Sequence, residues 1–113
     1  MQDLKLKSLG QFIGTEQYYK IWNVNVTDGI KYIMDNGYSW FITDFIAVFM
    51  NKPILKNEEF LSIKLRIENN KAKMIVTDGN TKTLYTQEYE WTDAQIPLNL
   101  YCCDGVLMLS GEY

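Results

Sequence analysis

The spacing of apolar residues along the chain changes near residue 60, from a helical period to a strand period. In residues 30–34 and 38–50 apolar side chains recur as they do in a helix, which predicts two helices. The turn at 27–29 caps the first helix and Asn36-Gly37 ends it. The second is apolar nearly all round, so we expect it to be buried on most sides.

The start of the chain carries weaker patterns. Apolar residues between 4 and 13 predict a further short helix that stops at Gly14. Residues 18–22 fit either a strand or a helix. The first half of the chain is therefore predicted to be mainly helical.

After residue 60 apolar and polar residues alternate, which predicts half-buried strands. A turn at Asn69-Asn70 sets Ile67 against Ala72, Leu65 against Met74 and Ile63 against Val76, the register that gathers the apolar side chains on one face. A turn at 78–80 leads to a strand whose Tyr85, Tyr89 and Trp91 share that face. Asp104-Gly105 predicts a final hairpin. The five expected strands cover residues 61–68, 72–76, 83–91, 98–103 and 106–109.

These elements predict an α+β fold in one domain, residues 1–113. Two to three N-terminal helices are expected to pack on one face of a C-terminal antiparallel meander of about five strands. The chain has 113 residues, of which 47% are hydrophobic, enough for a core without disulfides or metal ions.

Composition argues against most enzyme classes. The chain has no histidine, so the commonest general base and the commonest zinc ligand are missing. It contains no nucleophile elbow, phosphate-binding loop or dinucleotide fingerprint. We therefore expect a non-catalytic protein without a cofactor or a bound metal.

Charge points toward a protein partner. The formal net charge is −3, and a direct nucleic-acid binder is expected to be basic. Acids gather in the second half, with Glu88, Glu90 and Asp93 close together in the sequence. Such acids either form a solvated face or a negative surface that meets a basic partner.

Features related to cellular location favour the cytoplasm. The two cysteines, Cys102 and Cys103, are adjacent, and on a strand such neighbours point to opposite faces, so free thiols in a reducing compartment are expected. Residues 1–7 lack the apolar core of a secretion signal. No apolar run is long enough to cross a bilayer, so no membrane contact is expected.

One carboxylate stands out within the apolar helix. Asp44 lies in a stretch where burial is hard to avoid, and a buried carboxylate needs a partner. It is either a structural hydrogen-bond acceptor or the carboxylate of a pocket. In the second interpretation Asp28, Lys31, Tyr32 and Trp40 would complete the pocket, with Lys31 countering a phosphate.

Several blocks of the sequence resemble one family of small bacterial domains of unknown function. They are L-G-Q-F-I-G-T-E-Q-Y-Y at 9–19, T-D-G-I-K-Y at 27–32, Y-S-W-F-I-T-D at 38–44, the segment 85–93, and V-L-M-L-S-G-E-Y at 106–113. The chain departs from the family pattern at Ser110-Gly111, where relatives have proline and serine, and in the more apolar residues 45–49. The resemblance implies no activity, but it implies an origin on phages, plasmids and other mobile elements.

Three functions follow as hypotheses. In the first, which draws on the resemblance, the protein inhibits a bacterial defence system in the manner of an anti-CRISPR protein. It would bind a host defence protein, such as a CRISPR effector, through Glu88, Glu90 and Asp93. In the second, it binds a small molecule or a nucleotide signal in a pocket around Asp44. In the third, it is a structural or regulatory oligomer, a homodimer for example, built through a sheet edge or the apolar helix.

Overall fold

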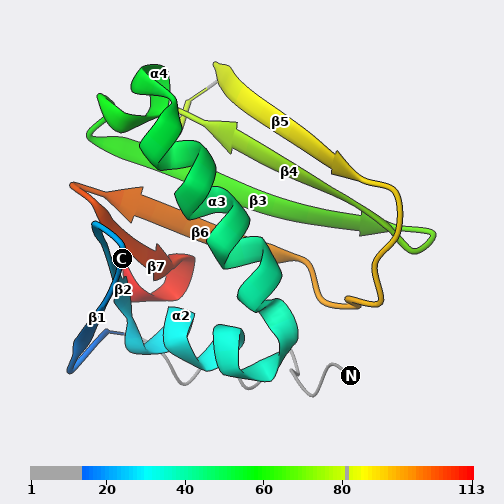
Figure 1. The fold of residues 1–113 in the computed structure, drawn as a ribbon, viewed down its shortest axis with the longest axis horizontal. Helices are drawn as coiled ribbons and strands as arrows, with labels where there is room; N and C mark the ends of the chain where they lie inside the picture. The colour runs from blue at the N-terminus through cyan, green and yellow to red at the C-terminus, as the bar shows by residue number, and fades with distance from the viewer. Residues whose placement is uncertain (1–13, 81) are drawn as a thin grey trace.

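A single twisted sheet forms the frame of the molecule in a computed structural model that describes residues 14–80 and 82–113 (Figure 1). The helix expected over residues 4–13 lies outside this range. In the described residues the sheet has seven strands, in the order β1-β2-β7-β6-β3-β4-β5. Neighbouring strands are antiparallel except β2 and β7, which are parallel. The strands are β1 (Tyr18–Ile21), β2 (Val24–Thr27), β3 (Phe60–Glu68), β4 (Lys71–Thr77), β5 (Thr83–Tyr89), β6 (Leu98–Cys103) and β7 (Val106–Leu109).

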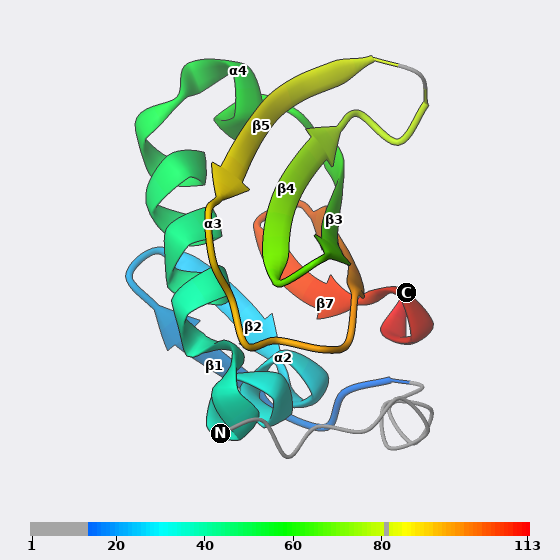
Figure 2. The same cartoon turned by 90° about the vertical axis from the view of Figure 1, so that its right-hand side faces the viewer.

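The helical segment lies between β2 and β3 and covers one face of the sheet (Figure 2). It consists of α2 (Asp28–Ile33), the turn η1 (Met34–Tyr38), α3 (Ser39–Asn51) and α4 (Pro53–Lys56), and a short turn, η2 (Ser110–Glu112), follows β7. The predicted break at Asn36-Gly37 is confirmed, because Gly37 has φ 102° and interrupts the helical backbone. None of the described helices is long and apolar enough to cross a membrane.

The core lies between this helical segment and the sheet. Phe41, Phe45 and Phe49 of α3 are buried against inward side chains of the strands, such as Leu65 and Met74. The predicted burial is confirmed for one face of α3 only, because the remaining side chains of this helix, Asp44 included, are half-buried or exposed. The cap of α2 is also confirmed, since the Thr27 hydroxyl accepts a hydrogen bond from the backbone N–H of Ile30.

The strands of the second half largely follow the predicted pattern. The β3–β4 register has Ile63 opposite Val76 and Leu65 opposite Met74, as predicted. Both turn residues between these strands, Asn69 and Asn70, have positive φ, which asparagine tolerates. The hairpin of β6 and β7 also forms, and it leaves Cys102 buried and Cys103 half-buried, both as free thiols.

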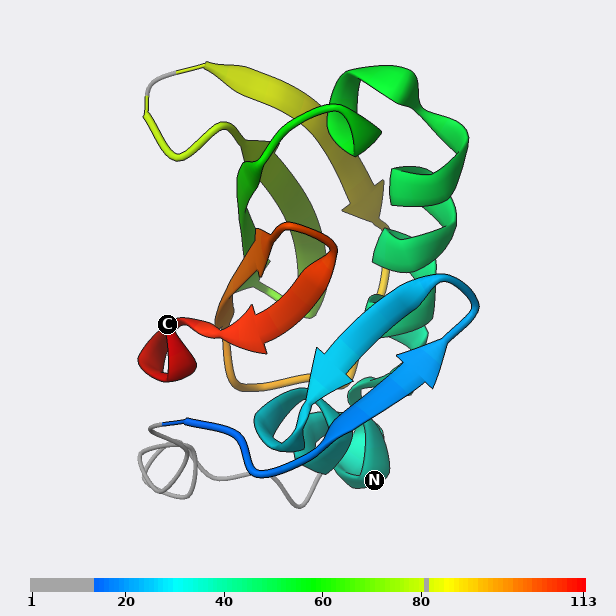
Figure 3. The ribbon, with the colours of Figure 1, turned by 90° about the vertical axis from the view of Figure 1, so that its left-hand side faces the viewer.

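The predicted arrangement of N-terminal helices on a C-terminal meander is wrong. The sheet is mixed, its first two strands precede the helices, and β6 pairs with β3 rather than with β5. Residues 18–27 form a hairpin next to the C-terminal strand, visible as the blue and red strands of Figure 3. Each strand of this hairpin has only four residues, too few to show a clear alternation. The β3–β6 pairing depends on the path of the chain after β5, which no local pattern encodes.

Candidate functional site

A small aromatic hollow opens at the end of β5, beside the start of α3. We call it the Trp40–Asp93 hollow; its volume is about 200 Å³. Trp40 comes from α3 and Tyr89 is the last residue of β5, whereas the other lining residues belong to the segment that follows this strand. The lining residues are Trp40, Tyr89, Trp91, Thr92 and Asp93.

The aromatic walls of this hollow are fixed by packing. The rings of Trp40 and Tyr89 meet edge to face, with centroids 5.1 Å apart and an interplanar angle of 77°. Behind them Tyr38 stacks on Trp40 at 6.4 Å, and its hydroxyl donates to the backbone oxygen of Ile96 at 3.0 Å. Trp91 is 68% exposed, so part of the hollow's apolar surface faces solvent. One wall is therefore packed against neighbouring side chains, and the other is an exposed ring.

Two carboxylates give this region negative charge. The hydroxyl of Tyr89 donates to Oδ2 of Asp44 at 3.0 Å. Burial, and then the negative charge of Asp44, raise the pKa of Tyr89. Asp93 lines the hollow, and its charge adds to the burial that raises the pKa of Tyr38. Asp44 thus has the structural acceptor role predicted as one alternative, at the edge of an aromatic site.

The three acids proposed as one acidic face lie in different surroundings. Asp93 lies in the Trp40–Asp93 hollow, and Glu90 is an exposed residue just after β5. Glu88 lines a different hollow, on the sheet face away from the helices, where it stands opposite Lys73 of β4. The structure therefore places Asp93, but not Glu88, beside the aromatic residues.

The residues proposed as a pocket around Asp44 are also divided. Trp40 and Asp44 both lie beside Tyr89. Lys31 forms an exposed ion pair with Asp35 at 2.8 Å, one turn along the same helical segment, and the neighbouring Tyr32 is half-buried. Neither Lys31 nor Tyr32 lines the Trp40–Asp93 hollow.

Asp28 belongs to a polar network at the start of α2. Its carboxylate accepts a hydrogen bond from the backbone N–H of Glu16 at 2.9 Å, and this bond lowers the pKa of Asp28. Its own backbone N–H donates to the Thr15 hydroxyl, also at 2.9 Å. Asp28 thus holds the segment before β1 against α2, which is a structural role.

Glu112 is the centre of this network, although sequence reasoning assigned it no role. Its carboxylate accepts hydrogen bonds from the Thr27 hydroxyl at 2.6 Å, the Gly29 N–H at 3.1 Å and the Leu109 N–H at 2.9 Å. A Cβ at Gly29 would meet the ends of the Glu112 and Leu109 side chains, so a larger residue there would displace the Glu112 carboxylate from its donors. Residues 15–16, 27–29 and 109–112, which belong to three of the quoted sequence blocks, therefore meet at one place.

Tyr89 and Trp91 are two further residues of the site that were not predicted from the sequence. Both were predicted to face the helices, and for Tyr89 this is correct, since it lies opposite Ala72 on the inward side. Trp91 lies beyond the end of β5 and is exposed, so its predicted strand position is wrong. The available signal in the sequence was a tryptophan placed between two acids, Glu90 and Asp93.

Metal, thiol and aromatic groups differ in what the described residues provide. No group of three or more cysteine, aspartate or glutamate side chains that could hold a metal ion occurs in residues 14–80 and 82–113. Burial raises the pKa of the Cys102 thiol to about 12, so this cysteine is a poor nucleophile at neutral pH. Aromatic faces beside carboxylates, in contrast, are suited to bind cations.

Comparison with protein families gives one result. A family model described as a family of unknown function, DUF6876, matches residues 3–113, and the chain belongs to this family. Searches of curated proteins and of solved structures find no match.

Proposed function

We propose that this member of DUF6876 is a non-catalytic protein that binds a basic partner protein. A lysine or arginine side chain of the partner enters the Trp40–Asp93 hollow. The observation that carries the proposal is the juxtaposition of Trp40 and Trp91 with Asp93, from two separate parts of the chain.

A cation is favoured by two features of the hollow. The faces of tryptophan and tyrosine rings attract cations by about 0.5–2 kcal/mol. The carboxylate of Asp93 adds a negative charge beside these rings, and Asp44 adds another behind Tyr89. An anionic ligand would meet two negative charges at this position.

The volume of the hollow favours a single side chain over a nucleotide. Small-molecule sites usually measure about 300–1,000 Å³ and are largely enclosed. The Trp40–Asp93 hollow measures about 200 Å³ and is open to solvent beside Trp91. A nucleotide-binding module built around Asp44 is therefore the weaker proposal.

The narrower role of a defence inhibitor is supported by the resemblance of the sequence to a family of domains from mobile elements. CRISPR effectors bind nucleic acid through basic residues. A phage protein that blocks such an effector would need a surface that binds these basic residues. The negative charge and the aromatic rings of the hollow are compatible with that role. The role of inhibitor needs a test separate from that of cation binding.

Cation binding can be tested by following the tryptophan indole N–H signals in an NMR titration. An arginine-rich peptide is added to the protein, with a glutamate-rich peptide of equal length as the control ligand. We expect the signals of Trp40 and Trp91 to shift. Trp22, 57% exposed in the turn between β1 and β2, does not line the hollow and serves as an internal reference.

Two charge reversals sharpen the titration. Asp93→Lys should abolish the shifts, whereas Glu58→Lys, at an exposed acid just before β3, should leave them unchanged. Equal shifts of all three indoles, or equal weakening by both variants, would contradict a specific cation site.

Inhibition of defence is tested in cells that carry a CRISPR system and express either the wild-type protein or Asp93→Lys. The proposal expects phage to form plaques with the wild type and not with the variant. Absence of rescue by the wild type across a panel of defence systems would disprove the inhibitor role, and the peptide titration would still decide cation binding.

A further inference from the structure

The sheet face opposite the helices carries a basic stripe. Lys64 and Arg66 point outward from β3, and Lys71 and Lys73 point outward from β4, because their neighbours Leu65, Ala72 and Met74 are buried on the other side. The chain has a net charge of −3, yet these two strands hold four basic residues and one acidic residue, Glu68. This local charge is opposite to that of the whole chain.

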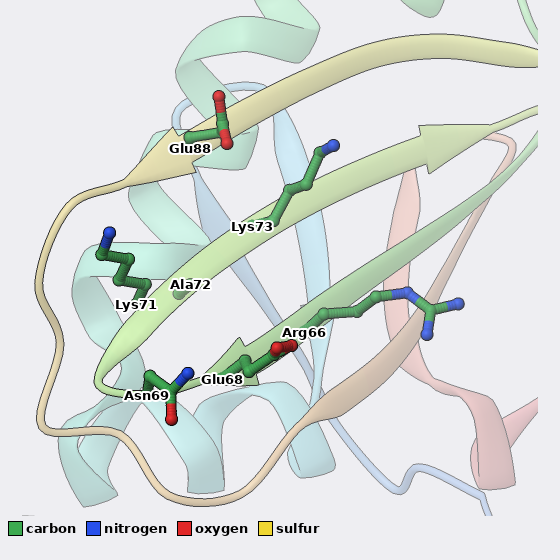
Figure 4. Close-up of a pocket in the computed structure, with 7 residues that line it drawn as sticks. All are labelled: Arg66, Glu68, Asn69, Lys71, Ala72, Lys73 and Glu88. Carbon is green, nitrogen blue, oxygen red and sulfur yellow. The ribbon is translucent and has the colours of Figure 1, made fainter.

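The stripe lies over two adjacent hollows. One, of about 390 Å³, is lined by the charged side chains shown in Figure 4: Arg66, Glu68, Lys71, Lys73 and Glu88, with Asn69 and Ala72. The other, of about 280 Å³, lies between β3 and the segment before β6, and its lining includes Lys64 and Asn99. Arg66, the only arginine of the chain, lines both. The two hollows are therefore neighbours along one face.

The arrangement of charges in the stripe does not favour the stability of the fold. Arg66 stands directly opposite Lys73, and like charges at such positions destabilise a sheet. Glu68 and Glu88 stand opposite Lys71 and Lys73, but in the part of the chain that the structure describes only Lys31 and Asp35 come within 4 Å as an ion pair. The guanidinium of Arg66 therefore has no carboxylate within that distance among these residues.

An aromatic cluster continues the stripe on the same face. Tyr101 of β6 lies opposite Ser62, which precedes Lys64 by two residues on the outward side of β3. Its ring contacts Phe60 and Tyr113, with centroids 5.0 and 5.3 Å away. Tyr113 is 73% exposed. Cationic and aromatic side chains thus share one open surface.

We infer that this face binds single-stranded nucleic acid. Phosphates lie along Lys64, Arg66 and Lys73, and a base stacks on the exposed ring of Tyr113. Single strands are bound by this combination of positive charge and aromatic surface. An acidic peptide would use the positive charges but would have no use for the exposed tyrosine, and this difference favours the nucleic acid. The site lies apart from the Trp40–Asp93 hollow and does not depend on it.

The inference is tested by fluorescence anisotropy with short labelled strands of oligo-dT and oligo-rU at low salt. The salt dependence of the wild type is compared with that of the double variant Arg66→Ala/Lys73→Ala. Loss of two phosphate contacts should reduce the slope of log K against log salt by about 1.4. Tyr113→Ala should weaken binding about tenfold, because it removes the exposed ring on which a base stacks.

A matched double variant separates this site from general attraction. Lys20→Ala/Lys56→Ala removes two exposed lysines outside the stripe and should leave the salt slope within error of the wild type. Circular dichroism confirms that each variant folds. No binding by the wild type at low salt would overturn the inference. So would displacement of the strand by polyglutamate together with no effect of Tyr113→Ala, because the ligand would then be an acidic protein segment.

Discussion

The two faces of the sheet have different chemistry, although both are built from the same strands. The covered face consists of buried apolar side chains such as Ile63, Leu65 and Met74, packed against α3. The open face alternates with it and exposes Arg66 and Lys73. The covered face must be apolar for the core to form, whereas the open face only has to be compatible with water. Charged and aromatic side chains on the open face are therefore better candidates for a binding role than side chains of the core.

The strongest test of this contrast compares one substitution on each side. Phe45→Ala removes a fully buried ring from α3 and should lower the free energy of unfolding by about 3–5 kcal/mol. Arg66→Ala, on the open face, should change it by less than about 0.5 kcal/mol, because the side chain is exposed. Urea denaturation measures both. A loss above about 2 kcal/mol for Arg66→Ala would show that the open face also supports the fold.

The next largest effect is expected where the ends of β2 and β7 meet the start of α2. Glu112→Ala removes the acceptor of three hydrogen bonds, from Thr27, Gly29 and Leu109. We expect a loss of about 2–3 kcal/mol, since two buried or part-buried backbone donors would be left unpaired. Thermal unfolding measures it. Glu112→Gln, which keeps one acceptor oxygen, should cost less, and an equal cost for both would show that charge rather than geometry matters.

Tyr89, on the covered face, is expected to make the stability of the protein depend on pH. Its pKa is raised in the folded protein, by burial and then by Asp44, above the value of about 10 expected for an unfolded chain. The unfolded state therefore loses this proton first as pH rises, and stability falls above about pH 10. Tyr89→Phe should make this alkaline loss shallower while costing about 1 kcal/mol at neutral pH.

The exposed Tyr18 supplies the control for that measurement. Tyr18→Phe should leave the alkaline slope close to that of the wild type. Urea titrations between neutral pH and pH 11 give both slopes. If the two variants behave alike, the hydrogen bond from Tyr89 to Asp44 does not contribute to the pH dependence.

The smallest expected effect is at the turn between β3 and β4. Asn70 has φ 61°, a conformation that glycine adopts at lower cost than asparagine. An Asn-Gly pair is also the preferred sequence of such two-residue turns. Asn70→Gly should therefore stabilise the protein by at most about 0.5 kcal/mol. A loss of stability in urea would mean that the asparagine side chain has a role of its own in the turn.

The sequence correctly predicts those elements that depend on residues close to them in the chain. The register of Leu65 with Met74 follows from alternation and one short turn, and α3 follows from a continuous apolar run. The place of β6 beside β3 and the parallel pairing of β2 with β7 depend on contacts between distant segments. β1 has only four residues. The alternation seen at Tyr19 and Ile21 is therefore too short a pattern to distinguish a strand from a helix.

The candidate site was predicted in pieces. Asp44, Trp40 and Asp93 were each identified, the first because a carboxylate in an apolar run is costly. Their common neighbour Tyr89 could not be found without knowing that the end of β5 lies beside α3. Glu88 was grouped with Asp93 by its nearness in sequence, whereas the strand places it on the opposite face.

The parallel pairing of β2 with β7 also has a consequence for how the chain folds. Asn25 and Val106, which lie side by side, are eighty-one positions apart, so a long loop must close before they meet. During synthesis the N-terminal hairpin leaves the ribosome long before its neighbour in the sheet. The hairpin of β3 and β4 has its partners close at hand and can form early. We therefore expect the hairpin of β1 and β2 to be the last part of the sheet to assemble, with Val24 and Val26 exposed in the nascent protein until β7 arrives.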